Sequence, residues 1–405
     1  RAAWASKHPV QHGILKLLWA MVPYRGGEAS PESPPLETSK EQTANGLKAL
    51  AHYLGAVGIG ICEIPDYCWY SHNKAGEKVD PYHKYAIMML IDQGHETFEG
   101  GCGDDWISGS QSMRSYMRGG EISGIMAEHI RLMGFPARAQ TSLDSDVLHV
   151  PLVLLTGQGE LSRIGESALN PFLGPRFKTV VLTTDMPLAV DMPIDFGLQK
   201  FCGTCLKCAR ECPSQAIPFG EKIIFNGYET WKPDSEKCTR YRMMNMKGSA
   251  CGRCIKVCPL TKDITWDGAL YARIGAGLGS HALLLKPVLP RLAIWLDEKM
   301  GNGNPVDEKK WWLDLGVAGE KGHQPDPENF CVIPKGANRK TINKQRAYDG
   351  STQQLAAYPA DVIPPAKPNG PTPTNRKAGI EWMAQAERVD QALERRRNKA
   401  LETAE

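Results

Sequence analysis

The chain has 405 residues, of which 42% are hydrophobic and 23% charged, and its formal net charge at pH 7 is +3. This length allows two or three structural units, and the composition is that of a compact globular protein, which excludes the disordered, collagenous and coiled-coil classes. The nearly neutral charge and the lack of a long basic face argue against nucleic acid as a partner.

The N-terminal part is predicted to wrap over the main domain. The chain begins with Arg1, so we expect a processed or trimmed form from which any targeting peptide has been removed. Residues 26–35 are rich in Gly, Ser, Glu and Pro, and they separate an apolar piece, residues 12–24, from the main domain. We therefore assign residues 1–37 to an N-terminal wrap.

Helical and strand-like patterns follow one another in the main domain. Ser39 is a suitable N-cap for a helix in which Leu47, Ala51 and Leu54 recur at helical spacing. Strands are predicted at residues 55–64, 85–91, 136–141 and 179–184, and a long helix at residues 111–133. This order predicts an α+β domain with a central sheet and covering helices.

Eight of the twelve cysteines are crowded into the 57 residues from Cys202 to Cys258, which indicates a metal centre rather than disulfides. Cys202, Cys205, Cys208 and Cys212 form C-x2-C-x2-C-x3-C-P, the bacterial ferredoxin pattern for [4Fe–4S] clusters. A pair of four-cysteine zinc sites is the alternative, but zinc ribbons lack the C-x3-C-P ending. The pattern therefore predicts iron–sulfur clusters and one-electron transfer.

A second motif, Cys251, Cys254 and Cys258, repeats the end of the first one, and Cys238 is available to replace its missing first ligand. In two-cluster ferredoxins the fourth cysteine of each motif binds the other cluster. We therefore assign the first cluster to Cys202, Cys205, Cys208 and Cys258, and the second to Cys212, Cys238, Cys251 and Cys254.

The other four cysteines are scattered, and we expect buried or free thiols at Cys62, Cys68, Cys102 and Cys331. Beyond the cysteine motifs the chain is rich in aromatic residues and is predicted to be helical to about residue 320. Its most apolar stretch, residues 274–296, contains prolines and charged residues that a membrane-spanning helix would not tolerate. A core segment is expected there, and packing against a partner or a membrane surface is the alternative. Residues 321–405 are predicted to form an extended wrap and a charged C-terminal helix.

Several short runs before and after the clusters resemble the corrinoid-dependent respiratory reductive dehalogenases. The runs are GELSR at 159–163, GPR at 174–176, TDMPL at 184–188, PIDFG at 193–197 and IMAEHIRLMGF at 125–135. Residues 294–301 and the pair Trp311–Trp312 are similar to the aromatic segment that follows the clusters in the family. The resemblance covers roughly residues 47–315.

The resemblance implies a nitroreductase-like, cobamide-binding core with an inserted ferredoxin-like domain. In this division, residues 38–197 form the first part of the catalytic domain, residues 198–262 the two-cluster domain, and residues 263–320 complete the catalytic domain. It also implies that the clusters reduce a buried, base-off cobamide to Co(I), which replaces halogen by hydrogen in an organohalide. The sequence contains no D-x-H-x-x-G run for a histidine ligand, in agreement with base-off binding.

By the same resemblance, Tyr116 occupies the position of the tyrosine that gives a proton to the substrate carbon. A phenol has one proton to give, and a nearby cation stabilises the phenolate that is left. Arg176 is our first candidate for this cation and Lys178 the second. A half-buried structural tyrosine is the alternative for Tyr116.

Other candidate residues surround this assignment. A polar residue that orients the tyrosine is expected among Ser142, Asp144, Ser145 and Asp146. Aromatic side chains that either line an apolar substrate pocket or belong to the core are Trp69, Tyr70, Phe98 and Trp106. Arg163 and Asp185, within the family-like runs, are either functional or structural. The residues of the cobamide pocket are not identified.

The resemblance implies partners and a location as well. Family members with this layout are exported by a twin-arginine signal and lie at the outer face of the cytoplasmic membrane, bound to a small integral-membrane anchor protein. An upstream respiratory electron donor and a small organohalide, such as a chlorinated alkane or alkene, are then expected, and a homo-oligomer is possible.

Two alternatives to dehalogenation remain open from the sequence. One is an enzyme like epoxyqueuosine reductase, which uses the same cofactors on tRNA, although GELSR and Tyr116 differ from its pattern. The other is a ferredoxin-type electron carrier with no chemistry of its own. A nicotinamide site is not supported, because GAGLG at residues 275–279 follows no clear strand.

Overall fold

In the computed structural model of the chain, the residues described are 9–32, 38–73, 75–245, 250–261, 289–301, 303, 304, 306, 310 and 312. Helices and an antiparallel sheet are mixed in this part, so the predicted α+β class is confirmed. The assignments for residues 263–288 and 321–405, and Cys331, lie outside the described residues.

The central sheet has four strands in the order β1-β2-β6-β3, and each neighbouring pair is antiparallel. Its strands are β1 (Gly58–Glu63), β2 (Tyr85–Asp92), β3 (Ala137–Gln140) and β6 (Phe177–Thr184). The sequence predicted all four within a few residues of these bounds.

β2 is buried on both faces, which explains why it is apolar almost throughout. Alternate residues point to opposite faces of a strand, so Ile87 and Met89 contact one hydrophobic cluster while Met88 and Leu90 contact another. The first cluster includes side chains of α3 (Lys40–Leu54) and α5 (Ile107–Leu132), and the second includes side chains of α6 (His149–Leu155). The sheet is therefore covered by helices on both faces.

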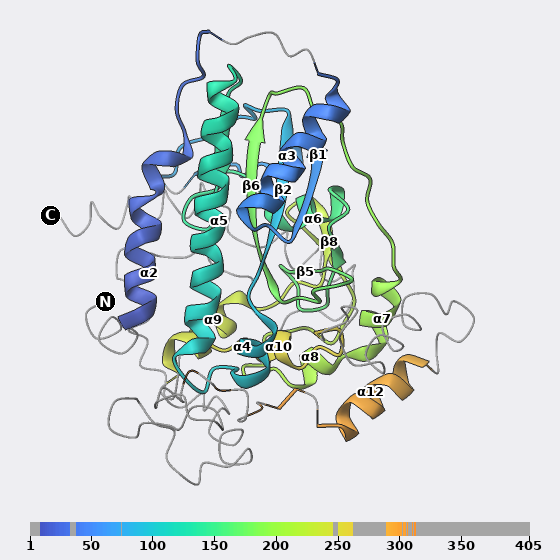
Figure 1. The fold of residues 1–405 in the computed structure, drawn as a ribbon. Coiled ribbons are helices and arrows are strands. Elements are labelled where there is room, and N and C mark those ends of the chain that lie inside the picture. Colours follow the sequence, from blue (N-terminus) through green and yellow to red (C-terminus); the bar gives the residue numbers. More distant parts are fainter. Residues whose placement is uncertain are drawn as a thin grey trace, which may run out of the picture.

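Capping residues determine where the helix α3, which covers the sheet, begins and ends. Ser39 caps α3 in a complete capping box with Gln42, and Gly55 ends this helix in a left-handed conformation. The N-terminal segment includes the helix α2 (Pro9–Ala20), which lies along α5 (Figure 1). No helix in the described ranges is long and apolar enough to cross a membrane.

One edge of β6 is only half covered by its neighbour. β3 pairs with β6 from Val181 to Thr184, whereas β2 pairs with β6 along its whole length from Phe177. The edge of β6 on the β3 side, around Lys178 and Thr179, therefore has no strand partner from β3. The chain leaves β3 at Gln140 and continues past this edge towards α6, which leaves room there for a cavity.

The cysteine motifs lie on short elements gathered at one end of the sheet (Figure 1). These are α7 (Leu198–Cys205), α8 (Lys207–Arg210), α9 (Ser235–Met244) and α10 (Arg253–Lys256). The hairpin of β7 (Ile223–Phe225) and β8 (Tyr228–Thr230) follows α8 in the chain and carries no cysteine. The remaining elements are η1 (Val22–Arg25), η2 (Asp66–Cys68), α4 (His95–Gly100), β4 (Glu160–Leu161), β5 (Ala168–Leu169) and α12 (Leu289–Lys299).

Two glycines bring the sheet domain against the cysteine-bearing part. Gly165 has φ +68° and Gly174 has φ +61°, a left-handed region that favours glycine. A Cβ atom at Gly165 would lie 1.9 Å from the carbonyl oxygen of Trp231, and one at Gly174 would lie 2.4 Å from that of Leu260. Any side chain would therefore push the two parts apart, which explains the Gly of the GPR run.

Candidate active site and cluster domain

The four cysteines assigned to the first cluster line one small cavity. Its wall includes the residues Cys202, Cys205, Cys208 and Cys258, together with Phe201, Leu169 and Arg163. Burial raises the pKa of Cys202 to about 12, and burial followed by the neighbouring Cys258 and Cys254 raises the pKa of Cys208. Because thiolates in such a place need compensating positive charge, the donor set fits an iron–sulfur cluster.

The other four cysteines form a second set beside the first. Burial, then the nearby Cys238 and Cys212, raises the pKa of Cys254 to about 12. Burial, Cys254, Cys102 and Cys238 similarly raise the pKa of Cys251. Cys238, which the sequence could place only by counting ligands, thus lies among these thiols. Since Cys208 of the first set is also affected by Cys254, the two sets adjoin.

Backbone hydrogen bonds support the sulfur atoms of the second set. The N–H of Ala216 donates to Cys212 Sγ at 3.3 Å, and the N–H of Arg253 donates to Cys251 Sγ at 3.4 Å. Hydrogen bonds of this kind stabilise the reduced, more negative form of a cluster and so adjust its potential.

The GELSR run holds the first cysteine helix in place. Glu160 accepts the N–H groups of Phe196 at 3.3 Å and Leu198 at 3.1 Å, where α7 begins. Arg163, 3% exposed, donates to the carbonyl oxygens of Cys202, Pro218 and Gly220 at 2.7–3.0 Å. Arg163 was considered as either a functional or a structural residue, and these contacts are those of a structural residue.

The segment before α5 holds two buried acidic residues and contacts the part of the chain that bears the second cysteine set, and the sequence did not reveal these contacts. Asp104 pairs with Lys310 at 2.6 Å, and Asp105 accepts a hydrogen bond from the Trp312 indole at 3.1 Å. Burial, then the neighbouring Asp104, raises the pKa of Asp105 to about 6. Nearby, Asn245 donates to the carbonyl oxygen of Gly103 at 2.6 Å. The partners of these acids lie far along the chain from the GGCGDD run, so no spacing within the run predicts the contacts.

A larger cavity of about 650 Å³ includes Tyr116 and Thr179 in its lining. Tyr116 reaches it from α5, the segment after β3 forms another part of the wall, and Asn226 and Tyr228 come from the β7–β8 hairpin. This volume lies within the usual range of ligand sites. The cavity therefore lies beside the half-covered edge of β6, next to the cysteine-bearing part.

Lys178, not Arg176, lies against the predicted catalytic tyrosine. The Lys178 ammonium is 4.9 Å from the centre of the Tyr116 ring. Arg176 is buried, donates to the Asp92 carboxylate at 3.0 Å and lies 3.3 Å from His95 Nδ1. The order in which the sequence ranked the two cations is thus opposite to their placement.

The other cavity tyrosines have acidic rather than basic surroundings. Burial, then the Glu166 carboxylate, raises the pKa of Tyr70 and of Tyr228. Both phenols therefore stay protonated, and neither is helped to release its proton. Tyr116 differs from them in having an ammonium group over its ring.

The aromatic candidates divide between cavity and core. Tyr70 lines the cavity with Tyr116, whereas Trp69 and Phe98 are 7% and 3% exposed and belong to the core. Trp106 is not among the residues that line this cavity. Asp185 is exposed and accepts the backbone N–H of Lys84 at 2.8 Å, a structural contact.

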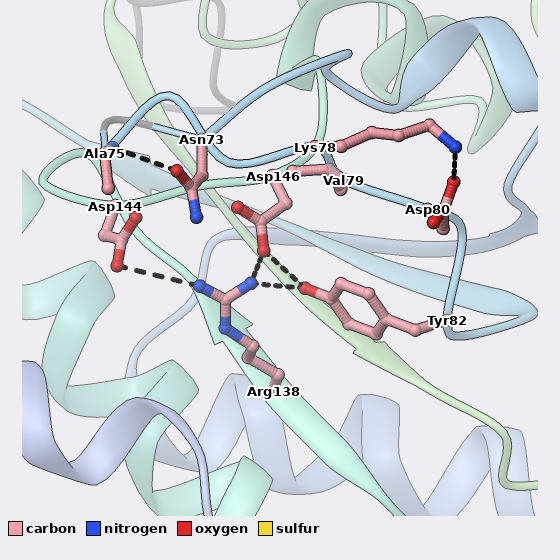
Figure 2. A pocket seen from close by; sticks show the side chains of 9 residues that line it. All are labelled: Asn73, Ala75, Lys78, Val79, Asp80, Tyr82, Arg138, Asp144 and Asp146. Carbon is pink, nitrogen blue, oxygen red and sulfur yellow. Dashed lines mark hydrogen bonds and ion pairs between the residues drawn. The ribbon is translucent and has the colours of Figure 1, made fainter.

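Three of the four polar candidates after β3 line the Tyr116 cavity: Ser142, Asp144 and Ser145. Asp146 instead faces a neighbouring polar pocket of about 350 Å³. Figure 2 shows Arg138 at its centre, paired with Asp144, Asp146 and the Tyr82 hydroxyl. Asp144 and Asp146 are thus engaged by a cation.

His149, at the start of α6, is a cavity residue that the sequence did not indicate. Its ring lies 3.0 Å from Thr179 Oγ1 and 3.1 Å from Ser145 Oγ. Burial lowers the pKa of His149 to about 4, against a smaller opposite effect of Thr179, so the ring is neutral at pH 7. A lone histidine before an apolar run gives no hint of these partners.

Comparisons with known proteins agree with this description. Residues 201–262 match the family model of the 4Fe-4S dicluster domain, so this segment binds two [4Fe–4S] clusters. The chain is 39% identical over 196 residues to the tetrachloroethene reductive dehalogenase of Sulfurospirillum multivorans, a match that covers 46% of this chain and 36% of that protein. It is 32% identical over 235 residues to the enzyme of the same name from Dehalobacter restrictus, covering 55% and 40%.

Solved structures extend the likeness to nearly the whole chain. The catabolic reductive dehalogenase NpRdhA is 43% identical, with a TM-score of 0.73, and the match covers 97% of this chain and 55% of that one. A reductive dehalogenase structure that suggested a mechanism for B12-dependent dehalogenation matches with 43% identity and a TM-score of 0.70. The chain thus spans about half the length, or less, of these relatives. Within this shared part, its sequence and fold are similar to those of the reductive dehalogenases.

Proposed function

We propose that this chain carries the catalytic site and the electron entry of a reductive dehalogenase. The reaction consumes an organohalide, two electrons and one proton, and releases the hydrogenated product and halide. The observation that carries the proposal is the pairing of Tyr116 with Lys178 in a cavity that adjoins the dicluster domain. The proposed proton donor would therefore lie close to the clusters that supply the electrons.

Tyr116 would supply the proton. A phenol is a weak acid, and an ammonium over its ring favours the phenolate that remains after transfer. Lys178 would give this stabilisation, while Arg176, held by Asp92, would fix the end of β6 that presents Lys178. Tyr70 and Tyr228 would line the cavity as neutral phenols.

The residues of the cavity fit a cobamide. When bound, this cofactor would supply the low-valent cobalt that breaks the carbon–halogen bond. The polar groups of Ser142, Thr179 and Asn226 are suited to the amide side chains of a corrin ring. Both ring nitrogens of His149 have hydrogen-bond partners, so this histidine is not a cobalt ligand. The relative associated with B12-dependent dehalogenation supports the same cofactor here.

For the substrate we propose a small chlorinated alkane or alkene. The two relatives named for tetrachloroethene support this class. NpRdhA, in contrast, has been solved with 3-bromo-4-hydroxybenzoic acid. A halogenated phenol is therefore the informative competing substrate in any assay.

Partners and location are proposed from the family resemblance. We expect export by a twin-arginine signal, a position at the outer face of the cytoplasmic membrane, a small integral-membrane anchor protein and a respiratory electron donor. Protease treatment of intact spheroplasts tests the location. Digestion of the protein without lysis is expected, and protection until lysis would contradict it.

Metal and corrin analysis of the purified protein, followed by a dye-driven halide assay, tests the function. We expect about eight iron atoms per chain, cobalt, and chloride release from chlorinated ethenes faster than bromide release from a bromophenol. Iron without cobalt would favour a plain electron carrier. Cobalt without halide release from any chlorinated alkane, alkene or phenol would favour an epoxyqueuosine reductase-like activity.

A further inference from the structure

Residues 141–148, between β3 and α6, form a large share of the wall of the Tyr116 cavity. Thr141, Ser142, Leu143, Asp144, Ser145, Val147 and Leu148 all line it. This segment is not a strand of the sheet. Its internal backbone pairing is the short Thr141–Asp144 bridge. Backbone hydrogen bonds to Tyr70 and Cys68 hold Asp146 and Leu148, so the placement of Ser145 depends on side-chain contacts.

His149 fixes one end of this segment through a chain of hydrogen bonds with a defined direction. Ser145 Oγ donates its proton to the carbonyl oxygen of Val147 at 2.9 Å, so it can only accept from His149 Nε2. The neutral ring then carries its proton on Nε2, and Nδ1 accepts from the Thr179 hydroxyl. The imidazole therefore joins the segment to β6, one residue after Lys178.

Arg138 fixes the segment from the other side, as Figure 2 shows. Its guanidinium pairs with Asp144 and Asp146, and the Tyr82 hydroxyl donates to Asp146 at 2.8 Å. The N–H of Asp146 donates to the Gln140 side chain at 2.8 Å. With Asp144 and Asp146 held independently, loss of His149 would release the Ser145 side chain and loosen the cavity wall around it.

We infer that His149 is a positioning residue that holds the 141–148 segment against β6 and thereby sets which organohalides fit beside Tyr116. This inference rests on the proposed function and adds a determinant of substrate selectivity to it. His149 has no part in the proton transfer itself, since both of its nitrogens are engaged by Ser145 and Thr179. It acts through the placement of Ser142, Leu143 and Ser145 in the cavity wall.

The test compares the purified wild-type chain with His149→Leu, His149→Gln and His52→Leu. Leucine keeps the bulk of the ring and removes both hydrogen bonds, whereas glutamine retains a donor and an acceptor. His52 is the matched control, because its ring bonds the Ala56 carbonyl oxygen at 2.8 Å on α3, away from the cavity. Amide hydrogen exchange over residues 141–148 and iron content are measured without any substrate.

In His149→Leu we expect faster exchange over residues 141–148, unchanged iron content, and a kcat/KM lowered about tenfold to a hundredfold. The loss should differ between a chlorinated ethene and a bulkier halide, mainly through KM. His149→Gln should restore slow exchange and most of the selectivity, and His52→Leu should match the wild type.

Each failure has its own signature. Exchange over 141–148 that is unchanged in His149→Leu, or equally raised in His52→Leu, overturns the role of His149. So does an equal loss of kcat/KM for every halide. A wild-type protein that contains both metals and releases no halide instead overturns the proposed function, whatever the exchange data show.

Discussion

The cluster domain and the Tyr116 cavity differ in how their residues are brought together. All eight cluster cysteines lie within 57 residues, and the short spacings within their motifs bring them close together. The cavity collects Tyr70, Tyr116, Thr179 and Tyr228 from elements far apart in the chain. Its shape therefore depends on packing and on the register of β6, whereas the cluster sites depend mainly on spacing.

The largest effect should follow from breaking the local ligand set. Cys208→Ala removes one ligand of the first cluster, and we expect iron to fall from about eight to about four atoms per chain, with loss of halide release. Iron analysis and electron paramagnetic resonance measure this. Cys62→Ala, a buried thiol of the core, is the control and should keep all the iron. Full iron content in Cys208→Ala would contradict the assignment.

The second largest effect is expected from replacing the proposed proton donor, Tyr116. Tyr116→Phe should lower kcat for halide release by about 10²- to 10⁴-fold, because the proton source is lost, while iron content stays the same. Tyr228→Phe is a matched control, being another half-buried tyrosine of the same cavity. Equal losses in the two variants would remove the special role of Tyr116.

Replacing Arg176, just before β6, and replacing Lys178, on β6, should have different kinds of effect. Lys178→Gln should lower kcat about tenfold to a hundredfold without loss of stability, since it removes the charge next to the Tyr116 ring. Arg176→Gln leaves Asp92 without its partner and should lower the melting temperature more than Lys178→Gln does. Steady-state kinetics and calorimetry on both variants would show the reverse if Arg176 were the cation of the reaction.

A smaller effect is expected from the support of the cluster domain. Arg163→Met removes three hydrogen bonds to carbonyl oxygens and should lower the free energy of unfolding by about 3 kcal/mol. Arg210→Met breaks an exposed pair with Glu298 and should cost less than about 1 kcal/mol. Anaerobic denaturant titrations compare the two, and similar losses would show that Arg163 is not a special support.

The smallest effect concerns pH. The folded chain keeps His149 neutral to about pH 4, while the unfolded chain protonates it near its ordinary pKa of 6.5. Stability contributed by the neutral ring is therefore present above pH 6.5 and is lost as the pH falls towards 4. Between pH 7.5 and 5 the wild type should lose about 2 kcal/mol more than His149→Gln in urea titrations. An equal loss in both would place the histidine in open solvent.

The difference between a cluster domain built from one segment and a cavity built from several also explains which features the sequence predicted. Spacing predicted the cluster cysteines, including Cys238, since ligand number and loop length are local properties. Apolar periodicity predicted the four strands and the helices over them. The ranking of Arg176 above Lys178 failed to agree with the structure because Asp92, at the end of β2, lies across from Phe177 and engages the arginine. Such partners depend on strand register, which no single segment encodes.

The sequence did not predict the roles of His149 and of the acids in the GGCGDD run for a related reason. Their partners, Ser145 and Thr179 in one case and Lys310 and Trp312 in the other, become neighbours only in the folded chain. The sequence also could not tell which aromatic candidates belong to the core and which line the cavity. That division depends on which side chains face the half-covered edge of β6 in the folded chain.

The backbone contacts at Gly165 and Gly174 have a consequence for how such an enzyme can change over time. Main-chain atoms meet there with no side chain between them, so the spacing of the two domains cannot be adjusted by exchanging one residue for a larger one. In the wall formed by residues 141–148, by contrast, the side chains of His149 and Arg138 hold Ser145, Asp144 and Asp146, and such contacts can change one residue at a time. Substrate preference can therefore diversify while the route of the electrons stays the same length.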